Sequence, residues 1–161
     1  MLGSKFKHND KDSCHSNTLT LHDCVAERID FCDGYLRFVL TDGFWITPNH
    51  NDNNFGNTVR TDAAIVDFNI RNMSDITVRV FTPSIFKKTK VEIWEMRELM
   101  QTVNSGSCSI EFISQYRAYF EQMWHCAIRS KKKPYYRECQ LHLPETEAIF
   151  RWNNLRAECE W

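Results

Sequence analysis

Residues 29–45 read IDFCDGYLRFVLTDGFW, and this stretch decides the fold class. Apolar and polar side chains alternate along it, as they do in a β-strand with one buried face. Two Asp-Gly pairs, Asp33-Gly34 and Asp42-Gly43, interrupt the alternation. Asp-Gly is a strong signal for a two-residue hairpin turn, because both central residues of that turn need positive φ. The stretch therefore predicts an antiparallel meander.

The two turns also predict which side chains face each other across the strands. The expected pairs are Ile29 with Phe38, Phe31 with Leu36, Asp30 with Arg37, and Leu40 with Trp45. One side of the meander then carries only apolar residues: Ile29, Phe31, Leu36, Phe38, Leu40 and Trp45. This side is the expected core face, with Phe38 lying between Ile29 and Thr47.

The rest of the chain continues the β pattern, with one exception. Strands are expected at residues 64–71, 76–81, 109–116, 136–143 and 148–153. A helix is expected where Met96, Leu99, Met100 and Val103 follow helical spacing and Asn104 to Gly106 supply a stop. Residues 119–130 fit neither period cleanly, so helix and strand both stay open, with strand favoured.

The predicted fold class is α+β, a predominantly antiparallel sheet with one short helix packed on it. Residues 1–18 are polar and show no period, which predicts a mobile N-terminal arm. Residues 19–161 are expected to form a single β-rich domain, since a chain of this size can bury roughly 70% of its unfolded surface around one core.

Composition and charge narrow the functional classes. The chain is 42% hydrophobic and 25% charged, which is typical of a folded protein. It holds neither an apolar signal-peptide core near its start nor a run of the ~20 apolar residues that span a membrane, so a cytoplasmic location without membrane contact is expected. The net charge of −1 argues against a nucleic-acid partner. The short basic run at 131–133 is interpreted as a solvated loop.

Cysteine and histidine side chains are the candidate metal ligands and nucleophiles of this sequence. Cys14, His15, His22 and Cys24 lack the paired spacings that wrap a zinc ion, so no metal is expected. The seven cysteines are odd in number and irregularly spaced, which predicts mostly reduced thiols, several of them buried. A nucleophilic Cys-His pair would have Cys24 or Cys126 as the thiolate and His22, His125 or His142 as the base, but structural thiols are the expected role of these cysteines.

The sequence also lacks a complete calcium loop and the common catalytic motifs. The loop at 49–57 resembles a calcium loop only in part, because Phe55 stands where an oxygen ligand belongs. Motifs typical of nucleotide-binding, serine-hydrolase and zincin chemistry are absent from the sequence. No cofactor is expected, and the protein is predicted not to be an enzyme.

The segment LHDC at residues 21–24, followed by two predicted strands, resembles small bacterial immunity proteins of polymorphic and contact-dependent toxin systems. The resemblance covers about residues 21–46. It implies a sheet-rich, cytosolic, non-enzymatic protein that occludes a toxin. From the residues themselves, His22 and Asp23 are expected to be architectural, with His22 bonding a carbonyl and Asp23 accepting backbone N–H groups.

The uneven charge of the two halves of the chain predicts a partner site. Residues 1–75 hold 11 acids and 7 bases, whereas residues 76–161 hold 10 acids and 13 bases, giving −4 and +3. A negative rim that attracts a cationic protein partner, such as a toxin domain, is expected around two aromatic side chains. Its residues are Asp33, Asp42, Asp52 and Asp62 around Phe44 and Phe55. The alternative is a small-molecule or carbohydrate cleft lined by Trp45, Tyr116, Tyr119, Trp124 and Trp152.

Overall fold

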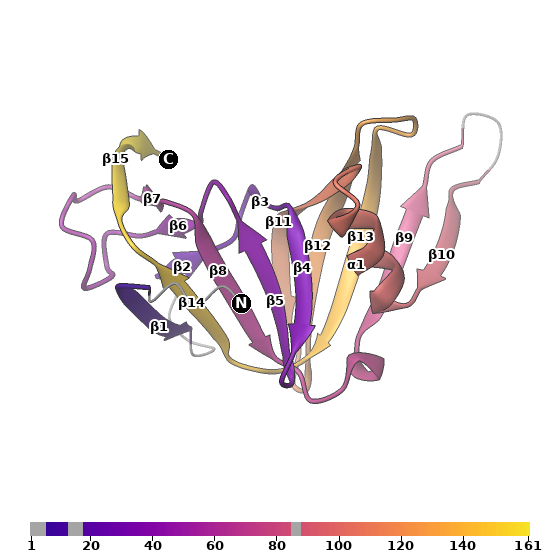
Figure 1. The fold of residues 1–161 in the computed structure, drawn as a ribbon, viewed down its shortest axis with the longest axis horizontal. Helices are drawn as coiled ribbons and strands as arrows, with labels where there is room; N and C mark the ends of the chain where they lie inside the picture. The colour runs from indigo at the N-terminus through magenta and orange to yellow at the C-terminus, as the bar shows by residue number, and fades with distance from the viewer. Residues whose placement is uncertain (1–5, 13–17, 85–87) are drawn as a thin grey trace.

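The computed structural model describes residues 6–12, 18–84 and 88–161. It is dominated by antiparallel β-sheet with one short α-helix, as the sequence predicts. The first sheet has the order β1-β14-β8-β5-β4 and consists of β1 (His8–Asp12), β14 (Ala148–Trp152), β8 (Ala64–Asn69), β5 (Tyr35–Leu40) and β4 (Arg28–Cys32). Figure 1 shows this sheet in front.

Two further sheets complete the fold. The second has the order β10-β9-β13-β12-β11-β3, with β10 (Lys90–Trp94), β9 (Thr77–Thr82), β13 (Tyr136–Pro144), β12 (Glu121–Ser130), β11 (Cys108–Arg117) and β3 (Cys24–Ala26). The third has the order β15-β7-β6-β2, with β15 (Leu155–Glu160), β7 (Val59–Thr61), β6 (Trp45–Ile46) and β2 (Leu19–Thr20). Figure 1 places β15 and β10 near opposite ends of the longest axis.

The first hairpin is confirmed residue by residue. Ile29 pairs with Phe38, and Phe31 pairs with Leu36. Asp33 and Gly34 have φ values of 53° and 77°, which is the conformation that favours Asp-Gly in this turn. The core face is confirmed for Ile29, Leu36, Phe38 and Leu40, which are fully buried, whereas Phe31 is partly exposed.

The prediction of the second hairpin is wrong. The chain does turn at Asp42, since the Gly43 N–H donates to the Leu40 carbonyl over 3.2 Å, but it then leaves the sheet. Trp45 pairs with Thr20 and Arg60 in the third sheet and not with Leu40. The neighbour of β5 is β8, so Phe38 lies between Ile29 and Val66 and not beside Thr47.

Gly43 explains why the chain turns away. A Cβ atom there would lie 2.3 Å from the Asp62 carbonyl oxygen and 2.3 Å from Thr61 Oγ1, and φ is +71°. Only glycine lets the backbone pass this close to β7. The Phe44 N–H then donates to Thr61 Oγ1, and the Phe44 carbonyl accepts a hydrogen bond from the Thr61 N–H.

Replacing Gly43 by alanine is expected to lower the free energy of unfolding by about 2 kcal/mol, through the positive φ and the forced separation from β7. Chemical denaturation measures this change. The matched control is Gly56→Ala, where φ is +76° but no atom lies within 4 Å of the added Cβ. Equal losses in the two variants would contradict the close approach.

Part of the segment predicted to be a mobile N-terminal arm is a β-strand. Residues 8–12 form β1, which pairs along its whole length with β14, from His8 opposite Trp152 to Asp12 opposite Ala148. The imidazole of His8 stacks on Trp152 at 5.1 Å between ring centroids. This strand is held mainly by backbone pairing, so it carries no apolar period. Residues 1–5 and 13–17 of the expected arm lie outside the described part of the chain.

The later elements agree with the sequence pattern. Met73, Ser74 and Asp75 form the 3-10 helix η1 (Met73–Asp75). The helix α1 (Met96–Asn104) buries Met96, Leu99 and Val103, although residues 90–94 before it form β10. Residues 121–130 are a strand, β12, as favoured. β12 pairs with β11 and β13, and no residue from Gln122 to Ile128 is exposed on either face, which accounts for its nearly continuous apolar run.

Aromatic side chains join the first and second sheets. Phe38 of β5 meets Phe112 of β11 edge-on at 5.1 Å between ring centroids. Phe68 of β8 meets Trp124 of β12 at 6.2 Å. The helix α1 contacts β4, β9, β10 and β11, and Figure 1 shows it between β4 and β9. Asn104 fixes it to β4 by accepting from the Ile29 N–H and donating to the Ile29 carbonyl.

Candidate functional site

The expected negative rim does not assemble. Asp33 precedes β5 and Asp42 follows it, so the length of β5 separates the two residues. Phe44 is fully buried, and its ring meets Phe150 at 4.8 Å and Trp152 at 5.5 Å. Successive turns of antiparallel strands lie at opposite ends of the sheet, which is the physical reason for the error.

Two of the rim aspartates hold local structure. Asp42 forms ion pairs with Arg60 at 3.2 Å and with Arg156 at 2.7 Å. Asp62 accepts a hydrogen bond from the Asn154 side chain at 2.8 Å. Hydrogen bonding to Asp42 is the main cause of the raised pKa of Arg156. These contacts connect the loops beside β7 and β15.

The remaining rim residues belong to the loop between β6 and β7. Asp52 pairs with His8 at 3.0 Å. Phe55 is 50% exposed. The buried Asn53 holds the loop through hydrogen bonds to the carbonyls of Ile46 at 3.0 Å and Asn57 at 2.8 Å. The Asn53 amide is thus committed to the loop's own backbone.

The LHDC segment is built into the second sheet. His22 donates from Nδ1 to the Ile113 carbonyl, as expected, and its ring stacks on Trp161 at 5.1 Å. The carboxylate of Asp23 lies 3.3 Å from His22 Nε2, and the Asp23 N–H donates to the Phe112 carbonyl. No backbone N–H of the described residues donates to the Asp23 carboxylate, so that part of the expectation is wrong.

The cysteines of the considered pairs are unsuited to nucleophilic chemistry. Burial raises the pKa of the Cys24 thiol to about 12 and raises that of Cys126 well above its usual value. His125 and Cys126 point to opposite faces of β12, since neighbouring side chains of a strand do. Within the described residues, no group of three or more His, Cys, Asp or Glu side chains is arranged to hold a metal. Cys14 and His15 lie outside those residues.

The five aromatic residues of the alternative cleft are scattered. Trp124 and Trp152 are core residues, at 6% and 0% exposure. Trp45 lies in the third sheet, with the Arg60 guanidinium 4.8 Å from its ring centroid. Tyr116 lies near the end of β11 and Tyr119 lies in the turn that follows it, and both are exposed. No common cleft unites these five side chains.

A different feature stands out at the turn between β11 and β12. Tyr119 and Phe120 are 89% and 80% exposed, and their rings meet edge-on at 4.7 Å. The turn is ordered, because the Ala118 N–H donates to the Glu121 carbonyl at 2.8 Å. A second bond, from the Glu145 N–H to the Phe120 carbonyl at 3.0 Å, ties it to the next connection. We call Ala118 to Glu121 the aromatic tip.

The residues of the aromatic tip are not those that turn geometry prefers. Tight hairpin turns favour Gly, Asn or Asp, whereas here two bulky aromatic residues occupy the centre, both with negative φ. Residues that are unfavourable both for the local turn and for solubility often occur at a functional site. The sequence signal for this turn is the position of the pair at the junction of two predicted strands, although the same residues also fit the start of the second strand.

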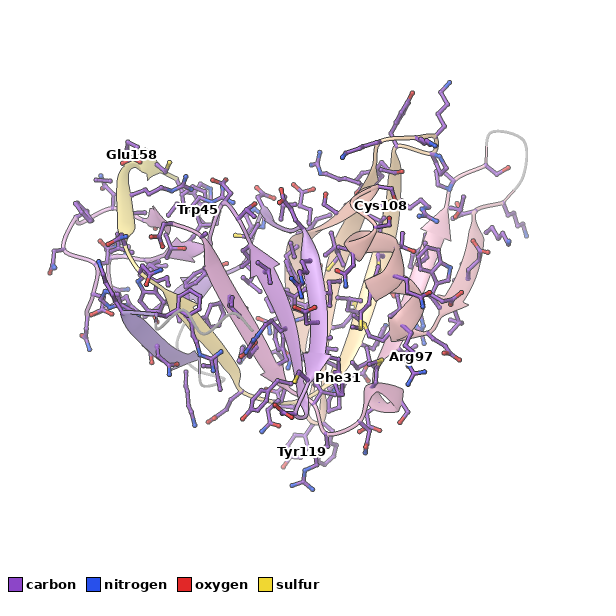
Figure 2. All side chains as sticks on the ribbon, viewed as in Figure 1. Phe31, Trp45, Arg97, Cys108, Tyr119 and Glu158 are labelled. Carbon is purple, nitrogen blue, oxygen red and sulfur yellow. The ribbon has the colours of Figure 1, made fainter. Side chains whose placement is uncertain are left out.

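Other loops gather at the same end of the molecule. The Ile70 N–H donates to the Gly34 carbonyl at 2.8 Å, and the Thr146 hydroxyl donates to the Asn69 carbonyl at 2.9 Å. Figure 2 shows Tyr119 projecting beyond the ribbon there, below Phe31. Acidic residues outnumber basic ones around this end: Asp33, Asp75, Glu121, Glu145 and Glu147 against Lys11, Arg71 and Arg117. Of these acids, Glu147 pairs with Lys11 and Glu121 contacts His142.

A shallow depression of about 290 Å³ lies beside the aromatic tip. It is lined by Asn69, Ile70, Arg71, Asp75, Pro144, Glu145 and Thr146. The surface there combines protruding apolar rings with carboxylates around them. Such a surface can dock into an apolar pocket that has a cationic rim.

Comparison with protein families, with characterised proteins and with solved structures finds no match to this chain. Among the helices of the described residues, none has the length and apolar character to cross a bilayer.

Proposed function

We propose that this chain is a non-catalytic binding protein of the inhibitory, immunity-like kind, and that it docks onto a cationic protein partner through the aromatic tip. The observation that carries the proposal is the exposure of Tyr119 and Phe120, at 89% and 80%. Monomeric proteins seldom expose neighbouring large rings without use, and aromatic residues are enriched among the residues that dominate binding energy.

Burial of this pair can supply a large share of the energy that specific binding requires. Two aromatic side chains bury about 300 Å² or more, which contributes about 7.5 kcal/mol at ~25 cal/mol per Å² before the costs of association. The tip is also held in place by two backbone hydrogen bonds, so little ordering is needed on docking. The surrounding carboxylates favour a partner with positive charge around its pocket.

The resemblance of residues 21–46 to immunity proteins supports the inhibitory role. Such a protein acts by covering a site on its target, which requires a protruding element and no chemistry of its own. The aromatic tip supplies that element. The buried thiols of Cys24 and Cys126, with their raised pKa values, fit a role without catalysis.

The test begins with a photo-crosslinking amino acid placed at Phe120 and, separately, at Tyr135, in a lysate of the natural host. Tyr135 and Tyr136 are the matched control, because they are adjacent, exposed aromatic residues in the hairpin at the other end of β12. We expect one discrete protein to be captured at Phe120, and capture to be prevented by excess wild-type protein.

The affinity of the purified partner is then measured by calorimetry. Tyr119→Ser/Phe120→Ser should weaken binding by about tenfold or more, which corresponds to about 1.4 kcal/mol, with an unchanged melting temperature. Tyr135→Ser/Tyr136→Ser should bind as the wild type does. A partner captured only at Tyr135, or bound equally by the tip variant, would overturn the proposal.

A further inference from the structure

The strand β10 forms an edge of the second sheet. It pairs with β9 on one side, and no described strand pairs with its other side. Figure 1 shows β10 as the outermost strand of that sheet. The backbone N–H and C=O groups that point away from β9 can pair with a further strand, so folded proteins usually protect such an edge.

Two other edge strands of the molecule are protected. The outer edge of β4 is closed where the Asn104 side chain binds both the N–H and the carbonyl of Ile29. β1, at the other edge of the same sheet, carries only polar side chains. β10 instead carries two β-branched apolar residues, Val91 and Ile93, which are 53% and 65% exposed. Such residues favour pairing with another strand.

The side chains of β10 alternate between the two faces of the second sheet. Val91 and Ile93 share one face, on which Val91 lies beside Phe81 of β9. Lys90 and Glu92 share the other face and form an ion pair at 2.8 Å. β10 therefore carries an apolar row on one face and two opposite charges on the other, with Val91 midway between the charges.

This arrangement is complementary to a second copy of itself. An antiparallel copy of β10 with Val91 opposite Val91 sets Lys90 of each copy opposite Glu92 of the other. Ile93 then lies opposite Thr89 and diagonal to Val91 of the other copy. The apolar residues of the two copies form one continuous row. Opposite charges and β-branched pairs are both stabilising in these positions.

The other charges around the edge cancel. Three basic and three acidic side chains lie on or beside β9, β10, η1 and α1: Arg79, Lys88 and Arg97, and Asp75, Glu95 and Glu98. Two copies therefore meet without net repulsion, and the charges within β10 decide the register. A register centred on Lys90 or on Glu92 would place like charges opposite each other, which is destabilising.

We propose that β10 is a dimerisation surface, at which two copies of this chain pair antiparallel about Val91 and join their second sheets into one. A two-fold contact of this kind is the commonest form of self-association. One five-residue strand from each copy makes a small interface, so the dimer forms with a Kd of about 10–100 μM. The aromatic tip, between β11 and β12, takes no part in the pairing.

Sedimentation equilibrium of the full-length protein tests the pairing with two charge variants. Lys90→Glu and Glu92→Lys each place like charges opposite each other, so each should weaken the wild-type dimer by about tenfold or more. An equimolar mixture of the two variants should associate as the wild type does, because every charge of one chain then meets an opposite charge of the other. Association of the mixture excludes a merely unfolded variant.

Disulfide trapping tests the register. Val91→Cys sets the new thiol opposite its own copy, at a Cα separation of about 4.5–5.5 Å that a disulfide can bridge. Mild oxidation should therefore give a covalent dimer. The matched control is Ile93→Cys, because residue 93 lies opposite Thr89 and should give no covalent dimer. Both variants are made in Cys32→Ser protein, since Cys32 is an exposed native cysteine.

Three outcomes would overturn the proposal. The first is a wild-type protein that stays monomeric at concentrations up to about 500 μM. The second is a mixture of the charge variants that associates no better than either variant alone. The third is equal trapping of Val91→Cys and Ile93→Cys. Tyr119→Ser/Phe120→Ser should dimerise as the wild type does, so failure of this surface and failure of the aromatic tip are distinguishable.

Discussion

Replacing Phe38 by alanine is expected to lower the free energy of unfolding by about 3–5 kcal/mol. The Phe38 side chain is fully buried at the centre of β5. Its ring meets Phe68 of the same sheet at 5.8 Å and Phe112 of the facing sheet at 5.1 Å. The substitution therefore opens a cavity where the two sheets pack, with no exposed side chain nearby to fill it.

Urea denaturation followed by tryptophan fluorescence measures the loss, and Phe55→Ala serves as the control. Phe55 is 50% exposed in a loop, so its truncation should cost less than about 1 kcal/mol. A loss at Phe38 as small as that at Phe55 would show that the packing of the two sheets is misassigned.

The second large effect is expected at Asp67. This carboxylate is 1% exposed, because arginine side chains from both neighbouring strands cover it. Arg37 binds it through two hydrogen bonds of 2.7 and 2.9 Å, and Arg151 donates to Oδ2. Asp67→Ala would leave two partly buried guanidinium groups without their counter-charge, which is expected to cost about 3 kcal/mol.

The same contacts predict a pH dependence. Burial alone would raise the pKa of Asp67, but hydrogen bonds from Arg37 and Arg151 outweigh it and hold the pKa below the usual value of 3.8. The stabilisation is therefore complete above the unfolded-state pKa and is lost as pH falls through the lower folded-state pKa.

Denaturation at a series of pH values checks this dependence. The wild type should lose stability as pH falls below about 4, and Asp67→Asn should lose less over that window. The exposed Asp75 is the control, and Asp75→Asn should leave the slope unchanged. A wild-type slope equal to that of Asp67→Asn would contradict the assigned ion pairs.

Local chemistry predicted the first hairpin but not the second. Asp33-Gly34 satisfies a requirement that lies within the turn itself, namely positive φ at both central residues. Gly43 also has positive φ, but its neighbours are Thr61 and Asp62, many residues later in the chain. A long-range approach of this kind leaves no local pattern, so the transfer of Trp45 to another sheet could not be predicted.

The aromatic tip was missed for a related reason. Tyr119 and Phe120 continue an apolar run into β12, and aromatic residues of sheet proteins are usually buried. Whether such residues lie inside a strand or at its end depends on register, which the bulge between Phe112 and Ser114 shifts. The strand β1 was missed because its side chains, His8 to Asp12, are all polar.

The most direct test of the proposed function is amide hydrogen exchange of the complex with the captured partner, compared with exchange of the free protein. The proposal predicts that binding slows exchange most strongly at residues 118–121 of the aromatic tip and at the adjoining residues 145–147. It also predicts little change in the hairpin that carries Tyr135 and Tyr136. Protection confined to that hairpin or to the third sheet, with the aromatic tip exchanging as it does in the free protein, would contradict the proposal.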